Sequence, residues 1–141
     1  MNRIRVCYPA VFHPEEDGGY SVVIPDMGQI DCCCVTQGDD FEEANKMAFD
    51  AVGLALEDVK PENFPVPSKP ENLEREKYDL VVPIIYDSYQ YLQKTNTKSV
   101  RKTLTIPEWM NVLAEANHIN FSKVLQNALA NQLGVNINPQ S

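Results

Sequence analysis

The stretch VRKTLTIPEW, residues 100–109, decides how the second half of the chain folds. Apolar side chains alternate along it with polar or cationic ones. The apolar residues are Val100, Leu104 and Ile106, and the polar or cationic residues are Arg101, Thr103 and Thr105. Because successive side chains of a strand point to opposite faces, this alternation predicts a strand with one dry face and one polar face. Pro107 ends the alternation, and proline suits the first position of a helix.

Two helices are predicted after this strand. The first covers residues 107–117 and carries a broad apolar stripe that begins at Trp109. Asn120 is placed to cap the second helix, whose apolar side chains keep the i, i+3, i+4 spacing until Gly134 ends it. Residues 100–141 therefore have the order strand, helix, helix.

Such a unit needs a partner. About 40 residues with one strand cannot pair the backbone of that strand or bury two helical stripes. A second copy related by a two-fold axis would supply an antiparallel strand, and the two-stranded ribbon would rest on four helices. The sequence therefore predicts a homodimer or a higher even-numbered oligomer. The alternative is an edge strand on the sheet of the first half, with Arg101 and Lys102 as solubilising charges.

The polar face of such a ribbon suits DNA. A two-stranded ribbon fits the major groove, where arginine reads guanine and threonine bonds base edges or touches a thymine methyl. The backbone amides of Phe121, Ser122 and Lys123, at the start of the second helix, suit a phosphate. We expect the DNA contacts to come from nine residues: Lys98, Arg101, Lys102, Thr103, Thr105, Asn120, Phe121, Ser122 and Lys123.

Charge divides the chain into two modules. The net charge is −8, but residues 1–97 hold 8 Lys/Arg against 18 Asp/Glu, whereas residues 98–141 hold 4 against 2. This asymmetry suggests different partners for the two modules. The longest apolar run, residues 51–56, is far shorter than the roughly 20 residues that cross a bilayer, and the start of the chain lacks the apolar segment of a signal peptide. We expect a cytoplasmic protein that does not contact a membrane.

The acidic module, residues 1–92, is predicted to be an α+β layer. A first strand carries its apolar side chains on one face, at Ile4, Val6, Tyr8, Ala10 and Phe12. Asp17, Gly18 and Gly19 supply a reversal into a second strand, with a third strand over residues 30–36. A helix of about 20 residues follows, with Asp39 and Glu42 as a capping box and Pro61 beyond its end. After a proline-rich loop, a fourth strand covers residues 79–86, and residues 93–99 link the modules.

The residues that carry chemistry point to no catalytic site. The cysteines are Cys7 and the run Cys32, Cys33 and Cys34; neighbours on a strand face opposite ways, so we expect buried reduced thiols rather than a zinc site. We predict that His13 is a turn residue rather than a catalytic base. Most of the scattered aspartates occupy turn or cap positions, which argues against a magnesium-dependent nuclease. We therefore predict no enzyme activity, no metal and no cofactor.

The basic module resembles a known family. The segment KSVRKTLTIPEWMNVLAEANHINFSKVLQNAL is similar to ribbon-helix-helix DNA-binding domains, the class of the Arc and MetJ repressors. The resemblance covers some 40 residues and favours the dimeric ribbon over the edge strand.

The acidic module resembles the N-terminal domain of HicB-type antitoxins. The resemblance rests on YPAVFHPEEDGGYSVVIPDM and CVTQGDDFEEANKMA, with a Tyr-Pro strand, a Gly-Tyr strand ending in Pro-Asp, and a Thr-Gln-Gly-Asp helix entry. It implies a partial RNase H-like domain that blocks HicA, an mRNA-cleaving toxin, in a chain that represses its own operon. Between Met27 and Val35 the chain departs from the family, because GQIDCCC replaces a compact Pro-Gly-Cys turn. Two other functions stay open: a metabolite-responsive ribbon-helix-helix transcriptional repressor and a small nuclease.

Overall fold

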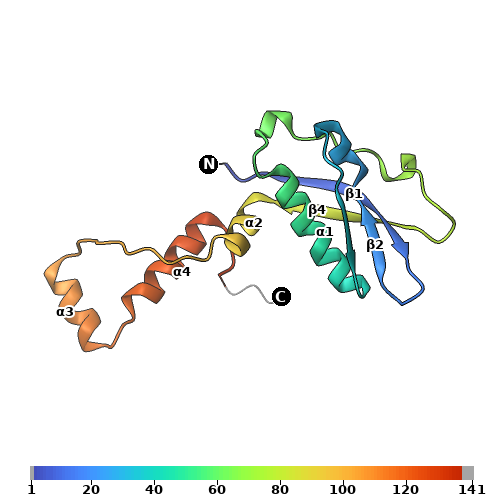
Figure 1. The fold of residues 1–141 in the computed structure, drawn as a ribbon. Helices are drawn as coiled ribbons and strands as arrows, with labels where there is room; N and C mark the ends of the chain where they lie inside the picture. Colours follow the sequence, from blue (N-terminus) through green and yellow to red (C-terminus); the bar gives the residue numbers. More distant parts are fainter. Residues whose placement is uncertain (1, 138–141) are drawn as a thin grey trace. The chain divides into compact units, whose positions relative to one another are not determined.

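The structure, a computed structural model, describes residues 2–137 (Figure 1). The chain divides between Thr95 and Asn96 into two compact units. We call them the N-terminal unit and the C-terminal unit. No helix among the described residues has the length and apolar character needed to cross a membrane.

The N-terminal unit is built on one antiparallel sheet. Its strands are β1 (Arg5–Pro14), β2 (Tyr20–Val23), β3 (Val35–Gly38) and β4 (Leu80–Asp87). The order across the sheet is β3-β2-β1-β4, and every neighbouring pair is antiparallel. The long strand β1 therefore lies between β2 and β4.

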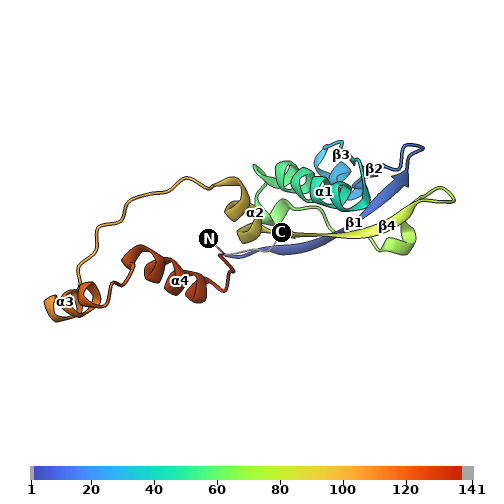
Figure 2. The same ribbon diagram turned by 90° about the horizontal axis from the view of Figure 1, so that it is seen from below.

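Helices and short 3₁₀ segments connect the strands. The helices are α1 (Phe41–Leu56) and α2 (Ser88–Thr95), and the 3₁₀ segments are η1 (Pro25–Ile30), η2 (Pro61–Asn63) and η3 (Pro70–Asn72). Figure 2 shows α1 lying along one side of the sheet. The α+β prediction for this half of the chain is confirmed.

The core lies between α1 and the face of the sheet that it covers. The alternation predicted for the first strand is confirmed, because Tyr8, Ala10 and Phe12 belong to this core and Val6 packs against it, whereas Val11, which is also buried, is outside it. The other buried apolar residues of this core are Val22, Ile24, Met27, Cys34, Ala44, Ala48, Val52, Leu56, Ile84 and Tyr86. This core forms where the apolar side chains of the helix pack against those of the sheet. Removing these side chains from water supplies most of the favourable free energy of folding.

Helix α1 begins one residue later than the capping box predicted. Asp40, not Asp39, is the N-cap, and its side chain accepts a hydrogen bond from the Glu43 amide at 2.8 Å. Glu43 accepts in return from the amide of Asp39 at 3.1 Å. The helix has 16 residues rather than about 20 and ends at Leu56, before Pro61 is reached. One turn apart on the helix, Glu42 and Lys46 form an i,i+4 ion pair at 3.4 Å.

The third strand is shorter than predicted and starts later. The predicted range of residues 30–36 is wrong at its start, because η1 extends to Ile30 and Asp31 follows in the left-handed region with φ of 56°. Pro25 sits at the first turn of η1, where its missing N–H costs no hydrogen bond. The backbone rejoins the sheet where the amide of Ile24 donates to the carbonyl of Cys34 at 3.0 Å.

The proline-rich connection of residues 57–79 is held to η1 by side chains. Asp26 is buried and accepts from both the amide and the hydroxyl of Ser68. Gln29 makes two bonds of 2.9 Å with the backbone of Val66, one as donor and one as acceptor. The Tyr8 hydroxyl donates to the Pro65 carbonyl at 2.9 Å, and burial raises the Tyr8 pKa to about 12. The connection is therefore ordered although it has little regular secondary structure.

The sequence predicts no helix over residues 88–95, where the structure has α2, and Asp87 determines where this helix begins. Asp87, the last residue of β4, accepts from the amides of Tyr89 and Gln90 at 3.0 and 3.3 Å and thereby caps α2. Its carboxylate also receives bonds from Arg3 at 2.7–3.2 Å. The hydrogen bonds from Arg3 lower the pKa of Asp87. Because α2 extends to Thr95, it crosses the domain boundary predicted after residue 92.

The prediction that the cysteines are buried is correct for only one of them. Cys34 is buried, and burial raises the pKa of its thiol to about 11. Cys32 is half-buried, whereas Cys7 and Cys33 are exposed. The difference follows from the sheet, since Cys7 lies on the face of β1 opposite the buried Tyr8.

Candidate nucleic-acid interface

The C-terminal unit contains the two predicted helices. They are α3 (Glu108–Ala116) and α4 (Phe121–Leu133). The side chain of Asn120 caps α4 by accepting from the amide of Lys123 at 3.1 Å. Gly134 follows the helix with φ of 67°, which glycine adopts without strain. The predicted starts, caps and ends of both helices are thus confirmed to within a residue.

The predicted strand is not formed by the single chain. Residues 96–107 have no assigned secondary structure, and the sheet among residues 2–137 has four strands, none of them from this segment. The edge-strand alternative is therefore wrong, whereas the strand predicted for residues 100–106 depends on pairing with a second copy. The physical reason is that a strand exists only against a hydrogen-bonded neighbour. The ribbon stays a prediction that requires a second copy.

All nine residues predicted to contact DNA are exposed. Five lie on the irregular segment before α3: Lys98, Arg101, Lys102, Thr103 and Thr105. The other four, Asn120, Phe121, Ser122 and Lys123, form the cap and first turn of α4. The structure brings Asn120 and Lys123 together through the cap bond.

One detail of the predicted phosphate site is wrong. The amide of Lys123 is already bonded to Asn120, so it cannot also serve a phosphate. The amides of Phe121 and Ser122 are the N-terminal donors of α4 that the cap leaves for a ligand. The hydroxyl of Ser122 accepts from Gln126 at 3.0 Å.

The C-terminal unit leaves its apolar side chains exposed. Of its described residues, Ala130 is the one apolar side chain classed as buried. The exposed large apolar residues, which we call the apolar set, are Val100, Leu104, Ile106, Trp109, Met110, Val112, Leu113, Ile119, Phe121, Val124, Leu129, Leu133 and Ile137. A soluble monomer of this size rarely leaves nearly all of the large apolar side chains of one unit open to water. The exposed surface of the C-terminal unit is therefore similar to one side of an obligate dimer interface, which is as apolar as the core of a domain.

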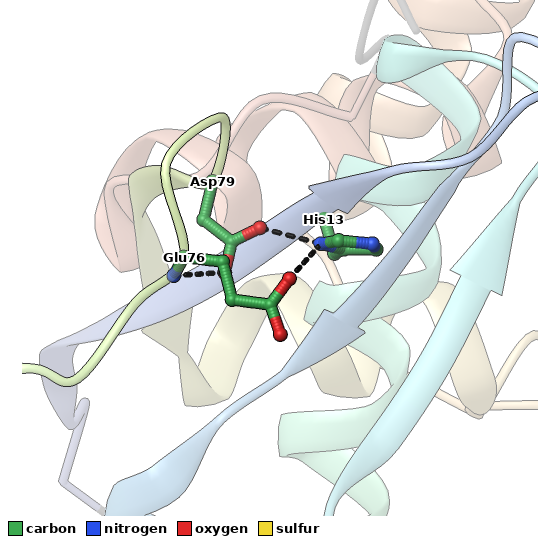
Figure 3. A group of neighbouring side chains, drawn as sticks. All are labelled: His13, Glu76 and Asp79. Atoms are coloured by element: carbon green, nitrogen blue, oxygen red, sulfur yellow. Dashed lines mark hydrogen bonds and ion pairs between the residues drawn. The ribbon is translucent and has the colours of Figure 1, made fainter.

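A second cluster of polar side chains lies in the N-terminal unit (Figure 3). His13 Nδ1 lies 2.6 Å from Asp79 Oδ1 and 3.7 Å from Glu76 Oε2. The hydrogen bond to Asp79 raises the pKa of His13. The pKa of Asp79 is lowered, first by the hydrogen bond from the Glu76 amide and then by the one from His13. The prediction that His13 is a turn residue is wrong, since it belongs to β1.

Sequence spacing could not reveal this cluster. His13 and Asp79 are brought together by the register of β1 with β4, in which Phe12 pairs with Leu80. Glu76 joins them through the tight turn before β4, where the Asp79 amide donates to the Glu76 carbonyl at 3.1 Å. One signal was available in the sequence. A His near the end of one predicted strand and an Asp at the start of another become neighbours if the two strands pair antiparallel.

Comparison with known proteins identifies the family. The family model described as "HicB_like antitoxin of bacterial toxin-antitoxin system" matches residues 8–128, which spans both units. The chain therefore belongs to the HicB-like antitoxin family. The resemblance of its first half to HicB-type antitoxins is confirmed.

Relatives and solved structures agree with this assignment. "Antitoxin HicB 1" of Photorhabdus laumondii is 42% identical over 60 residues, which are 43% of this chain and 36% of that protein. The match thus spans about a third of the curated relative. A chain of a toxin–antitoxin complex from Streptococcus pneumoniae is similar, with 26% identity, a TM-score of 0.52, and coverage of 92% of this chain and 99% of that one. The Burkholderia pseudomallei antitoxin HicB has 19% identity, covers 91% and 96%, and gives a TM-score of 0.44, too low to support an argument.

Proposed function

We propose that this chain is the antitoxin of a type II toxin–antitoxin system. Its N-terminal unit, a partial RNase H-like domain without enzyme activity, binds and blocks a HicA-type mRNA-cleaving toxin. Its C-terminal unit pairs with a second copy as a ribbon-helix-helix dimer and represses its own operon by binding operator DNA. Both partners and the chain itself meet in the cytoplasm.

The observation that carries the proposal is the exposed apolar set of the C-terminal unit. A unit of this size needs a buried core, and its own described residues supply almost none. A second copy offers an equal and self-complementary apolar surface, because a two-fold axis brings the same patch of each chain together. Pairing of residues 100–106 across that axis would place Arg101, Thr103 and Thr105 on the opposite, outward face.

The toxin half of the proposal rests on the family and on charge. The family is one of antitoxins, and the similar chain from S. pneumoniae was solved in a toxin–antitoxin complex. Residues 1–97 carry ten more acidic than basic side chains, a sign suited to a basic protein that binds RNA. Opposite charge accelerates encounter, while the apolar and hydrogen-bonded contacts set how long the complex lasts.

A pair of full-length variants tests the division of labour. Arg101→Ala should weaken binding to the DNA upstream of the gene by about 1–3 kcal/mol if Arg101 contacts a base edge. Lys69→Ala, which removes a cation from the N-terminal unit, is the matched control and should bind that DNA as the wild type does. Both should inhibit the toxin equally. Equal loss of DNA affinity in the two variants would reject the proposed interface.

A further inference from the structure

His13, Glu76 and Asp79 have the chemistry of a metal site that the antitoxin function does not use. One imidazole nitrogen and two carboxylate oxygens converge, and these three ligand atoms all lie within 4.8 Å of one another. Figure 3 shows both carboxylates directed at the same nitrogen of the His13 ring. We propose that this cluster binds one divalent transition-metal ion, of the size and preference of Mn²⁺ or Zn²⁺.

The three residues come from two segments that the fold fixes. His13 lies near the end of β1, beside the start of β4, where Phe12 pairs with Leu80. Asp79 immediately precedes β4, and its side chain is only 7% exposed. Its second oxygen accepts from the Glu76 amide at 2.9 Å, which fixes the direction of the carboxylate. A ligand oriented by such an outer hydrogen bond is held ready for a metal.

The two distances from His13 need only small adjustments to hold an ion, and the two carboxylate oxygens lie within 4.8 Å of each other. Bonds of about 2.0–2.2 Å place neighbouring ligand atoms roughly 3.0–3.4 Å apart. The distance of 2.6 Å between His13 Nδ1 and Asp79 Oδ1 must therefore increase by less than about 1 Å. The distance of 3.7 Å between His13 Nδ1 and Glu76 Oε2 must decrease by about 0.3–0.7 Å. Glu76 is 80% exposed, so its side chain is free of packing that would resist this movement.

The donor set selects the class of ion. Imidazole suits zinc, carboxylate oxygens also suit manganese, and Mg²⁺ and Ca²⁺ are held by oxygen ligands. Two carboxylates match the charge of a divalent ion. Three protein ligands leave further positions for water, because His13 is 44% exposed and the cluster lies at the surface.

A bound ion would join two parts of the chain. Glu76 and Asp79 end the long connection of residues 57–79, and His13 belongs to the central strand of the sheet. The metal would therefore clip the end of this connection to β1 and stabilise the N-terminal unit, and this stabilisation would increase with the logarithm of the free ion concentration above Kd.

Mn²⁺ titration of the full, untagged chain tests the proposal. Mn²⁺ is preferred to Zn²⁺ as the probe, because the exposed thiols of Cys7 and Cys33 favour softer ions. Calorimetry should show saturable binding of one ion per chain. Because the chain has two histidines, substoichiometric Mn²⁺ should broaden the ring NMR signals of His13 and leave those of His118 sharp.

Two substitutions separate this site from general binding of cations to acidic surface. Glu76→Gln should weaken Mn²⁺ binding about tenfold or more while the His13–Asp79 hydrogen bond and the fold remain. Glu74→Gln removes an exposed carboxylate of the same connection and should leave the affinity within about twofold of wild type. Equal broadening of both histidines, an unchanged affinity in Glu76→Gln, or no saturable binding up to millimolar Mn²⁺ would overturn the proposal.

Discussion

Gly38 is the position where adding a single methyl group should do most harm. It ends β3, and the first turn of α1 crosses directly over it. A Cβ at this position would overlap the backbone nitrogen of Ala44 and lie 2.6 Å from its Cα and 2.8 Å from the carbonyl carbon of Glu43. Carbon atoms in good contact are about 3.5–4.0 Å apart, so the helix would have to move away by roughly 1 Å.

The expected cost follows from what must move. Forcing an extra methyl group into packed structure typically costs about 1–3 kcal/mol, and here the obstacle is backbone rather than a flexible side chain. Alanine restricts the unfolded chain and returns about 0.4–1 kcal/mol of this. We expect Gly38→Ala to lower the free energy of unfolding by about 2 kcal/mol. For a unit of this size that corresponds to a fall in Tm of roughly 8–16 °C.

The chain provides separate optical probes for the two units. All six tyrosines lie in the N-terminal unit, whereas Trp109 is the one tryptophan and lies in the C-terminal unit. Thermal unfolding followed by tyrosine near-ultraviolet circular dichroism should show the loss. The control is Gly28→Ala, because a Cβ at Gly28 meets no atom within 4 Å. Its Tm should stay close to that of the wild type, and a Gly38→Ala protein equally close to wild type would refute the packing argument.

Three further predictions concern charge, assembly and DNA. Asp87→Asn should lower stability by about 1–3 kcal/mol at neutral pH, measured by urea unfolding. Because the pKa of folded Asp87 is lowered, its contribution is present above the unfolded pKa of about 3.9, and the gap between variant and wild type should close as the pH falls below it. Leu104→Asp should dissociate the dimer in analytical ultracentrifugation, whereas Leu54→Asp, exposed in the other unit, should not. Operator affinity should fall steeply with salt if Lys98, Lys102 and Lys123 contact phosphates, and a salt-independent complex would exclude those contacts.

Local signals predicted most of the elements. The alternation around Tyr8 and the Asn120 and Gly134 caps each depend on near neighbours in the sequence, and each is confirmed. One error arose where a tertiary contact overrides the local pattern. Asp87 caps α2 while bound to Arg3, a partner 84 residues away, and this contact leaves no periodic trace in the sequence. The third strand was misplaced for a local reason, because Asp31 ends η1 in a left-handed conformation with its amide bonded to the carbonyls of Gly28 and Met27.

The candidate sites divide in the same way. The residues proposed to contact DNA can be named from the sequence because strand alternation and a helix cap are local patterns, and their contact with DNA stays a prediction. The His13 cluster was not found, because it depends on which strands pair and in which register. For residues 96–107 the single chain is what limits the comparison. The sequence predicts that they pair with another chain, and one chain alone cannot form the ribbon.

The central claim is tested most directly by the effect of the full chain on RNA cleavage by the HicA-type toxin proposed as its partner, sought as a small protein encoded beside its gene. The purified chain is titrated into that protein, and cleavage of an mRNA substrate is followed over time. The account predicts that cleavage falls in proportion to the added chain and stops at a fixed stoichiometry, with Arg101→Ala as effective as the wild type. Undiminished cleavage in the presence of a several-fold excess of the folded chain would contradict it.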